Sequence, residues 1–134
     1  MKAVLLAVVL SVLAGCKTAP APRCAGNEQR SINELIYFGT ATPDGAVTEQ
    51  QWSDFLRDVV TPRFPQGLTT WPAAGQWRSA DGGLTRENSH VLNLVHGGDA
   101  AAEQAVRELV ETYKQRFRQE AVLRVKSHAC TRFD

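Results

Sequence analysis

The polar side chains best suited to bind a ligand alternate with apolar ones in two runs of the C-terminal half. Alternation with a period of two is typical of strands and sends neighbouring side chains to opposite faces. If the more apolar sets face the core, Asn93 and Arg124 remain on the open face. Arginine presents a planar fork of donors that suits a carboxylate or phosphate, and amide or phenol groups can orient such a ligand. The sequence therefore predicts a small-anion site on an open sheet face, formed by Tyr37, Gln76, Arg78, Asn93 and Arg124.

The remaining polar residues do not indicate metal or nucleophilic chemistry. His90 and His96 are six residues apart on one expected strand, about 20 Å at ~3.3 Å per residue, so they cannot share an ion. Ser89 and Ser127 each precede a histidine, but strand neighbours point to opposite faces and cannot activate one another. We expect no catalytic residue, no metal site and no cofactor.

Two segments have the spacing of amphipathic helices. Thr48 and Gln51 form a capping box before the first, whose apolar residues recur every three or four positions as far as Val60. Pro62 is expected to end that helix. Asp99 is placed to cap a second, longer helix. The expected buried stripe of this second helix consists of Ala102, Val106, Leu109, Val110, Tyr113 and Phe117.

Four segments are predicted to be strands, at residues 34–39, 68–78, 87–96 and 121–130. Pro72 cannot donate a ladder hydrogen bond, so the second strand should lie at an edge or be bulged around residues 72–75. Asp81-Gly82-Gly83 provides a hairpin turn before the third strand. The order β-α-β-β-α-β predicts a ferredoxin-like α+β fold, with two helices on one face of a four-stranded antiparallel sheet of order 4-1-3-2.

The first fifteen residues have the pattern of a secretory signal peptide. A positive start precedes an apolar run, residues 3–14, that is too short to span a bilayer. The run ends in Leu13-Ala14-Gly15-Cys16, which resembles the lipobox of bacterial lipoproteins, where the signal is cut before the cysteine and the cysteine carries the lipid. That resemblance implies a lipid anchor on Cys16. Lys17, where an aspartate would favour the inner membrane, favours the periplasmic side of a Gram-negative outer membrane.

The other two cysteines, Cys24 and Cys130, lie at opposite ends of the expected domain. In an oxidising compartment they are predicted to form a disulfide, worth up to roughly 4–5 kcal/mol in the chain-entropy model. Two free thiols are the alternative. Alternating Ala and Pro residues after Cys16 favour an extended spacer. We therefore expect a signal peptide over residues 1–15, a lipidated cysteine and tether over residues 16–31, and a single domain over residues 32–134.

The balance of charge argues against one class of partner. The chain has 15 basic and 14 acidic residues, and Lys2 is the charged residue that the expected signal peptide would remove. The remainder is therefore neutral and has no basic excess of the kind that nucleic-acid binding requires. Contact with the membrane is expected through the lipid on Cys16.

Four stretches occur in the same order as in a known family: LIYFG, VVTPRFPQGLT, GQWR and YKQRFRQEAVLRV. Together they resemble the small bacterial secreted proteins and lipoproteins catalogued as domain of unknown function 3574, over residues 34–133. The resemblance implies one intact domain and a cell-envelope setting, and it brings no catalytic residues.

Two functions remain open at this point. The first is a membrane-tethered module that binds a small anionic ligand or an envelope protein. The second is a small envelope enzyme in which Arg124 and Tyr37 orient a substrate. The sequence shows no paired acid and base for the second, which favours the first. The open face could also be half solvated, or it could form a homodimer interface.

Overall fold

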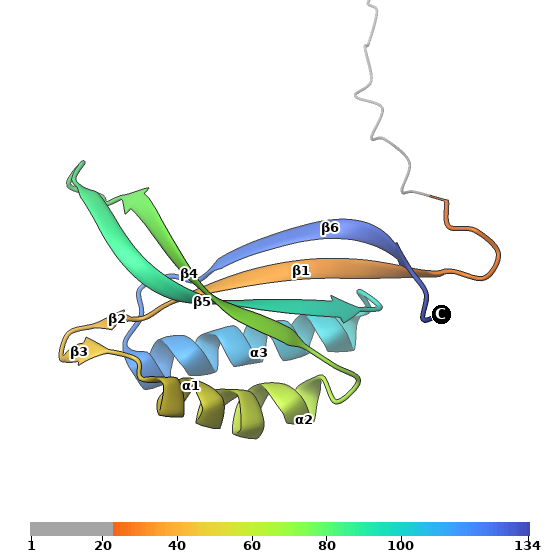
Figure 1. Ribbon diagram of the computed structural model, residues 1–134, viewed down its shortest axis with the longest axis horizontal. Helices are drawn as coiled ribbons and strands as arrows, with labels where there is room; N and C mark the ends of the chain where they lie inside the picture. Colours follow the sequence, from red (N-terminus) through yellow and green to blue (C-terminus); the bar gives the residue numbers. More distant parts are fainter. Residues whose placement is uncertain (1–22) are drawn as a thin grey trace, which may run out of the picture.

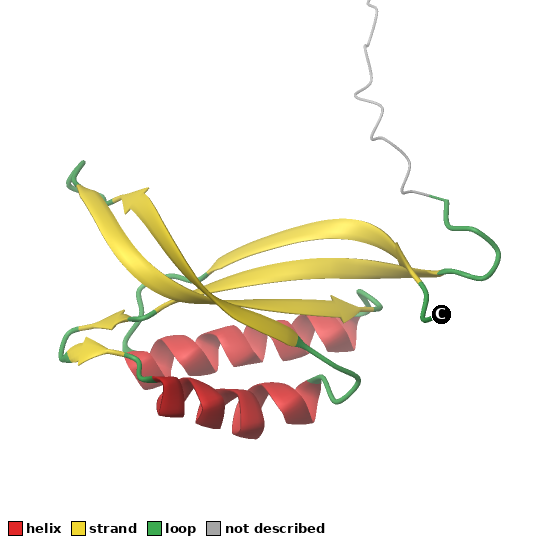
Figure 2. Ribbon diagram, viewed as in Figure 1, coloured by secondary structure: helices red, strands yellow, loops and turns green. Residues whose placement is uncertain are grey.

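The computed structural model describes residues 23–134 and places one four-stranded sheet over a layer of helices (Figures 1 and 2). The expected signal peptide, Cys16 and the Ala/Pro-rich part of the tether lie outside the described residues. Within the described part of the chain, no helix has the length and apolarity needed to span a bilayer.

The elements follow the predicted order, with one small hairpin added. The strands of the main sheet are β1 (Gln29–Gly39), β4 (Thr69–Arg78), β5 (Leu84–His96) and β6 (Leu123–Thr131). The hairpin consists of β2 (Ala41–Thr42) and β3 (Gly45–Ala46). The helical segments are α1 (Glu49–Phe55), a π-helical turn η1 (Leu56–Val60), α2 (Thr61–Arg63) and α3 (Ala100–Phe117).

The sheet confirms the ferredoxin-like prediction. Its order is β4-β5-β1-β6, and every pair is antiparallel. Counted along the chain, β1, β4, β5 and β6 are the first to fourth main strands, so this is the predicted 4-1-3-2 order read from β6. The strand predicted to lie at an edge is β4. Among residues 23–134 all helices lie on one side of the sheet, and no described element covers the other face, which we call the bare or open face (Figure 2).

The structure differs from the sequence prediction in several details of these elements. β1 begins at Gln29, so residues 29–31, which we assigned to the tether, belong to the sheet. Of the two alternatives for the strand that contains Pro72, the structure shows the edge position: β4 runs unbroken through Pro72, because an edge strand has outward-pointing positions where a missing N–H breaks no ladder bond. The first helix continues through Pro62 to Arg63, and a π-helical turn ends at Val60, two residues before the proline.

The core between sheet and helices is aromatic. Phe38 of β1 contacts the rings of Trp52, Phe55 and Tyr113, with centroids 4.5–5.8 Å apart. The capping box of Thr48 and the Asp99 cap form as the sequence predicts. The caps fix where the helices begin, so that their apolar stripes meet β1 and β5.

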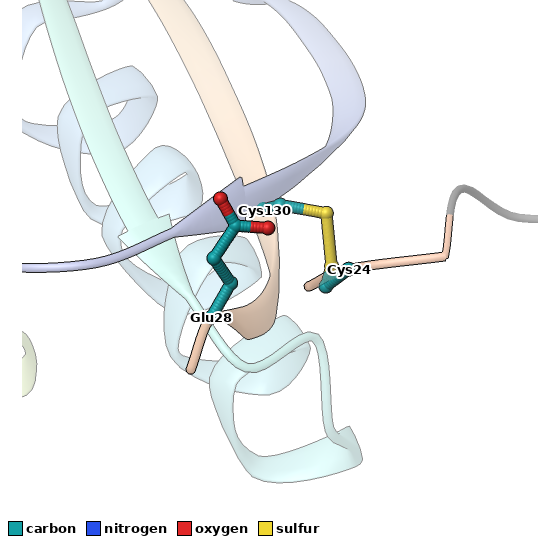
Figure 3. Close-up of side chains that lie close together, drawn as sticks. All are labelled: Cys24, Glu28 and Cys130. Carbon is teal, nitrogen blue, oxygen red and sulfur yellow. A yellow bond between two sulfur atoms is a disulfide. The ribbon is translucent and has the colours of Figure 1, made fainter. Parts of the chain in front are cut away.

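Cys24 and Cys130 are joined by a disulfide across a sequence separation of 106 residues (Figure 3). Glu28 lies beside this bond, and its carboxylate accepts a hydrogen bond from the Ala25 N–H at 2.8 Å. The disulfide ties the segment that precedes β1 to the end of β6, the strand paired with β1. The expected tether would therefore leave the domain at this end of the sheet.

Candidate functional site

Strand register determines which predicted site residues share a face. Ile36 lies opposite Leu92 and Arg124, so Arg124 points to the helix side of the sheet. Tyr37 lies opposite Val91 and therefore points to the bare side. The prediction that Arg124 lies on the open face is wrong. On β6, Leu123 and Val125 face the open side and Arg124 faces the helices.

The five predicted ligand residues therefore do not converge. Tyr37 and Asn93 share the open face, where the Asn93 amide donates to Asn33 at 2.6 Å. Gln76 and Arg78 lie on the other side of β4, towards the end of the hairpin, and Arg78 donates to the Gly82 carbonyl of the turn. The structure does not assemble the anion site that the sequence suggested, nor the substrate-orienting pair of the enzyme alternative.

A charged cluster under the sheet explains the orientation of Arg124. The cluster consists of Glu34, His96, Glu103, Arg124 and Lys126. Glu34 is fully buried in the middle of β1, where an unpaired carboxylate would be very costly. Arg124 donates to one oxygen of Glu34 through Nε at 2.5 Å, and His96 Nε2 lies 3.1 Å from the other. The buried carboxylate thus requires a cation, and β6 turns Arg124 inwards to supply it.

The hydrogen bonds assign the proton of the neutral His96 ring. The Gly98 N–H donates to His96 Nδ1 at 3.2 Å, so Nδ1 is the acceptor and the neutral ring carries its proton on Nε2. That proton points at Glu34. Both oxygens of Glu34 are therefore satisfied by donors from two different strands, β5 and β6.

Glu103, from the first turn of α3, completes the cluster. It accepts from Lys126 at 2.6 Å and from Arg124 at 3.4 Å. The hydrogen-bonded Lys126 ammonium holds the pKa of Glu103 below its usual value, and Arg124 adds to this effect. Burial acts to lower the pKa of Arg124, but the hydrogen bond and charge of Glu34, with those of Glu103, outweigh it and raise the pKa. The cluster holds two carboxylates against two cations, so its charges balance.

This arrangement favours a structural role for the cluster over ligand chemistry. Oxygens of Glu34 and Glu103 and a ring nitrogen of His96 lie within 4.8 Å of one another, as metal ligands would. However, both carboxylates already accept from Arg124 or Lys126, so a metal ion would have to displace a cation. The cluster ties β1, β5, β6 and the start of α3 together.

The hollow beside Arg124 is lined by charges of both signs. It has a volume of about 360 Å³ and lies between α3 and the segment that leads into β6. Three cations, Arg107, Lys114 and Arg124, line it together with Glu111 and Glu120. Lys114 pairs with Glu111 at 3.2 Å, and Arg124 is already bound to Glu34. A small anion there would face two carboxylates, so this hollow does not replace the predicted anion site.

His90 and His96 occupy separate environments. The buried His90 ring stacks on Trp52, with centroids 4.5 Å apart and planes 5° apart. Burial lowers the pKa of His90, and the Glu49 carboxylate at 3.8 Å opposes that effect only in part. His90 is therefore a core residue of the helix face.

The open face is almost uncharged and carries several large apolar residues among uncharged polar ones. Its large apolar residues keep two-fifths to three-fifths of their surface exposed: Trp71 41%, Val95 45%, Val125 46%, Trp77 49% and Leu123 60%. In the part of the chain that the structure describes, the open-face positions of the four strands carry one charged residue, Glu87. That carboxylate is bound to the Ala41 N–H at 3.0 Å and to Trp77 Nε1 at 3.3 Å.

The difference in charge between the two faces of the sheet is largest on β6. Arg124 and Lys126 point towards the helices, whereas Leu123 and Val125 point to the bare side. The usual alternation of a solvated sheet places apolar residues inwards and charged residues outwards, and β6 does the opposite. The open face is therefore the candidate functional surface of the domain.

Sequence reasoning missed Glu34 and Glu103 as the residues that set this polarity. Glu34 stands at i, i+2 and i+4 spacing with Ile36 and Phe38, the buried residues of β1. A carboxylate in the inward-facing set predicts an inward-facing cation on a neighbouring strand. That signal was present in the sequence and would have oriented Arg124 correctly.

Solved structures of low sequence identity share the fold of this domain. A phage SAM lyase in complex with S-methyl-5'-thioadenosine aligns with a TM-score of 0.56 and 17% identity, over 84% of this chain and 95% of the lyase. The same kind of lyase in its apo state gives a TM-score of 0.53 and 20% identity, over 81% and 87% of the two chains. CutA from Synechococcus elongatus, complexed with Bis-Tris, gives 0.51 and 10%, over 78% and 87%.

These identities are low enough that the likeness concerns the fold alone. No curated protein matches the chain. A model of a family of proteins of unknown function, DUF3574, matches residues 33–133, which include the sheet from Asn33 onwards and all the helices. The match covers most of the chain and confirms the resemblance drawn from the sequence motifs. The chain belongs to the DUF3574 family.

Proposed function

We propose that this chain is a lipid-anchored module of the bacterial cell envelope that binds protein through its open sheet face. The observation that carries the proposal is the reversed polarity of the sheet. Arg124 and Lys126 face the helices and pair with carboxylates, while Leu123 and Val125 face outwards. Apolar surface of this extent is favourable only when another surface covers it.

The geometry favours a protein over the small anion that the sequence also allowed. The Nε of Arg124 is committed to Glu34, and its Nη2 contacts Glu103. The open face offers no cationic side chain from the described strands to attract a carboxylate or phosphate. Tyr37 and Asn93 can hydrogen-bond a partner's backbone or side chains within an uncharged interface.

The membrane tether is the second part of the proposal. The tetrapeptide Leu13-Ala14-Gly15-Cys16 supports lipidation of Cys16, and the disulfide between Cys24 and Cys130 is typical of an oxidising compartment such as the periplasm. Acyl chains contribute about 0.8 kcal/mol for each buried CH₂, so two or more make attachment effectively permanent. The Lys17 position favours the outer membrane. A spacer of a few residues would hold the open face clear of the lipid surface.

Palmitate labelling tests the tether. The full-length chain, expressed in a Gram-negative host with an alkyne palmitate, should become labelled and should fractionate with membranes. Cys16→Ser should abolish both. The matched control, Cys24→Ser with Cys130→Ser, removes cysteines outside the lipobox and should keep the label. Label that survives Cys16→Ser would refute the anchor.

Photo-crosslinking in the same cells tests the open face. A photoreactive amino acid at Val125 lies on the open face, and one at the exposed Gln115 of α3 lies on the helical side. We expect a protein adduct from position 125 and much less from position 115. Equal or absent adducts at the two positions would refute protein binding through this face.

A further inference from the structure

We infer that the protein covering the open face is another copy of this chain. This inference rests on the proposed function, because it names the partner of the same surface. Four observations support it: the area of the face, its lack of charge, the projecting end of the β4–β5 hairpin, and the polarity of the edge strand β6.

The area of the face is close to what a stable interface needs. Four strands spaced ~4.8 Å apart, each contributing about seven residues at ~3.4 Å, cover roughly 19 Å by 24 Å. The hairpin beyond the sheet adds two strands of about five residues, which brings the flat area to on the order of 600 Å². Accessible area exceeds flat area, and stable interfaces bury about 800 Å² per partner. The open face of one chain is therefore large enough to hold a second.

The lack of charge suits self-association in particular. When a surface packs on a copy of itself, any charge near the symmetry axis meets a like charge. The open-face positions of the described strands hold the single charge of Glu87, and that carboxylate is already bound to Ala41 and Trp77. A partner of different sequence is usually selected by complementary charges, and a lipid surface by Lys and Arg. The open face offers neither kind of selection.

The end of the β4–β5 hairpin extends beyond the other two strands of the described sheet. Pairing between β5 and β1 stops at Ser89, and Thr40 still donates to the Asn88 carbonyl at 2.9 Å. Beyond this point the ladder of residues 84–87 is formed with residues 75–78. This two-stranded extension rises away from the helices (Figure 1). On the open face it exposes Trp77, which keeps 49% of its surface accessible. An isolated two-stranded ribbon is marginally stable in water, so contact with a neighbouring chain would stabilise it.

Edge strand β6 points to the same conclusion. A long exposed edge next to an apolar face risks uncontrolled sheet extension unless something covers it. The charged side chains that would discourage this, Arg124 and Lys126, are turned towards Glu34 and Glu103. A second chain over Leu123 and Val125 would cover the apolar side of this edge.

Sedimentation velocity on residues 17–134 tests the inference, since the sheet, the helices and the disulfide all lie within residues 23–134. We expect particles of two or more chains at micromolar concentration. Val125→Asp places an unpaired carboxylate in the interface and should weaken association by about 100-fold or more. Gln115→Asp, the matched control on the exposed side of α3, should leave association unchanged. Circular dichroism should show that both variants stay folded.

The alternatives give different results. A monomer at every accessible concentration overturns the inference. A folded Val125→Asp variant whose particles have the same mass as those of the unmodified chain overturns it as well. Adducts from position 125 with the mass of a different protein overturn the inference and leave the proposed function standing. Membrane binding by residues 17–134 to vesicles of phosphatidylethanolamine and phosphatidylglycerol, lost in Val125→Asp, overturns both. Adducts of twice the chain mass support both.

Discussion

The buried carboxylate of Glu34 makes the sharpest prediction about what holds the sheet to its helices. Its side chain is 0% exposed, and its partner Arg124 is 22% exposed. Breaking a buried ion pair by removing one partner costs roughly 3–5 kcal/mol. Because Arg124 is partly solvated and keeps Glu103, we expect Glu34→Gln to lower the free energy of unfolding by about 3 kcal/mol, the lower end of that range.

The hydrogen-bond pattern explains why glutamine does not substitute well. His96 Nδ1 accepts from the Gly98 N–H, so a neutral His96 presents an Nε2 proton to residue 34. Arg124 presents another donor. A carboxylate accepts from both, whereas an amide must turn its NH₂ group towards one of them.

Urea denaturation of oxidised residues 17–134 measures the effect, as a shift in midpoint at constant slope. Glu111→Gln is the matched control, because Glu111 pairs with Lys114 on the surface and should change stability by less than about 0.5 kcal/mol. Glu34→Leu combined with Arg124→Leu should cost less than the sum of the two single changes. Equal losses for Glu34→Gln and Glu111→Gln, or additive single changes, would refute the reasoning.

Three further predictions follow from the structure. Burial lowers the pKa of His90, so as the pH falls the unfolded chain protonates this ring before the folded chain does. The free energy of unfolding should therefore decrease as the pH drops below about 6.5. His90→Asn should flatten this part of a profile of stability against pH. Replacing Cys24 and Cys130 by serine should lower the free energy of unfolding by up to about 4–5 kcal/mol, and dithiothreitol should have the same effect on the unmodified protein in urea denaturation. Gly98→Ala should cost about 1–3 kcal/mol in thermal unfolding, because Gly98 has φ +73° and an added Cβ would lie 2.6 Å from Ile32 Cγ1.

Much of the fold could be predicted from local sequence signals. The apolar spacing after Thr48 and Asp99 located both helices, and strand order followed from the succession of elements. Pro72 correctly marked the edge strand. These signals are local because capping, helical periodicity and the missing proline donor act within a few residues.

The orientation of β6 could not be predicted in the same way. Its alternating residues allow either face to be buried, and hydrophobicity alone favours Leu123 and Val125 inside. The deciding interaction is with Glu34, a residue 90 positions away in sequence. A buried charge overrode the apolar pattern, and the predicted anion site depended on that pattern.

Oxidative footprinting of the full-length chain in intact membranes tests most directly whether the open face is covered. In a single chain Trp71 is 41% exposed, Leu123 60% and Phe133 102%, so Phe133 serves as the internal reference. The proposal predicts that Trp71 and Leu123 are protected relative to the same residues in Val125→Asp, while Phe133 reacts equally in both. Equal oxidation of Trp71 and Leu123 in the two proteins would contradict it, because the face would then be open to solvent.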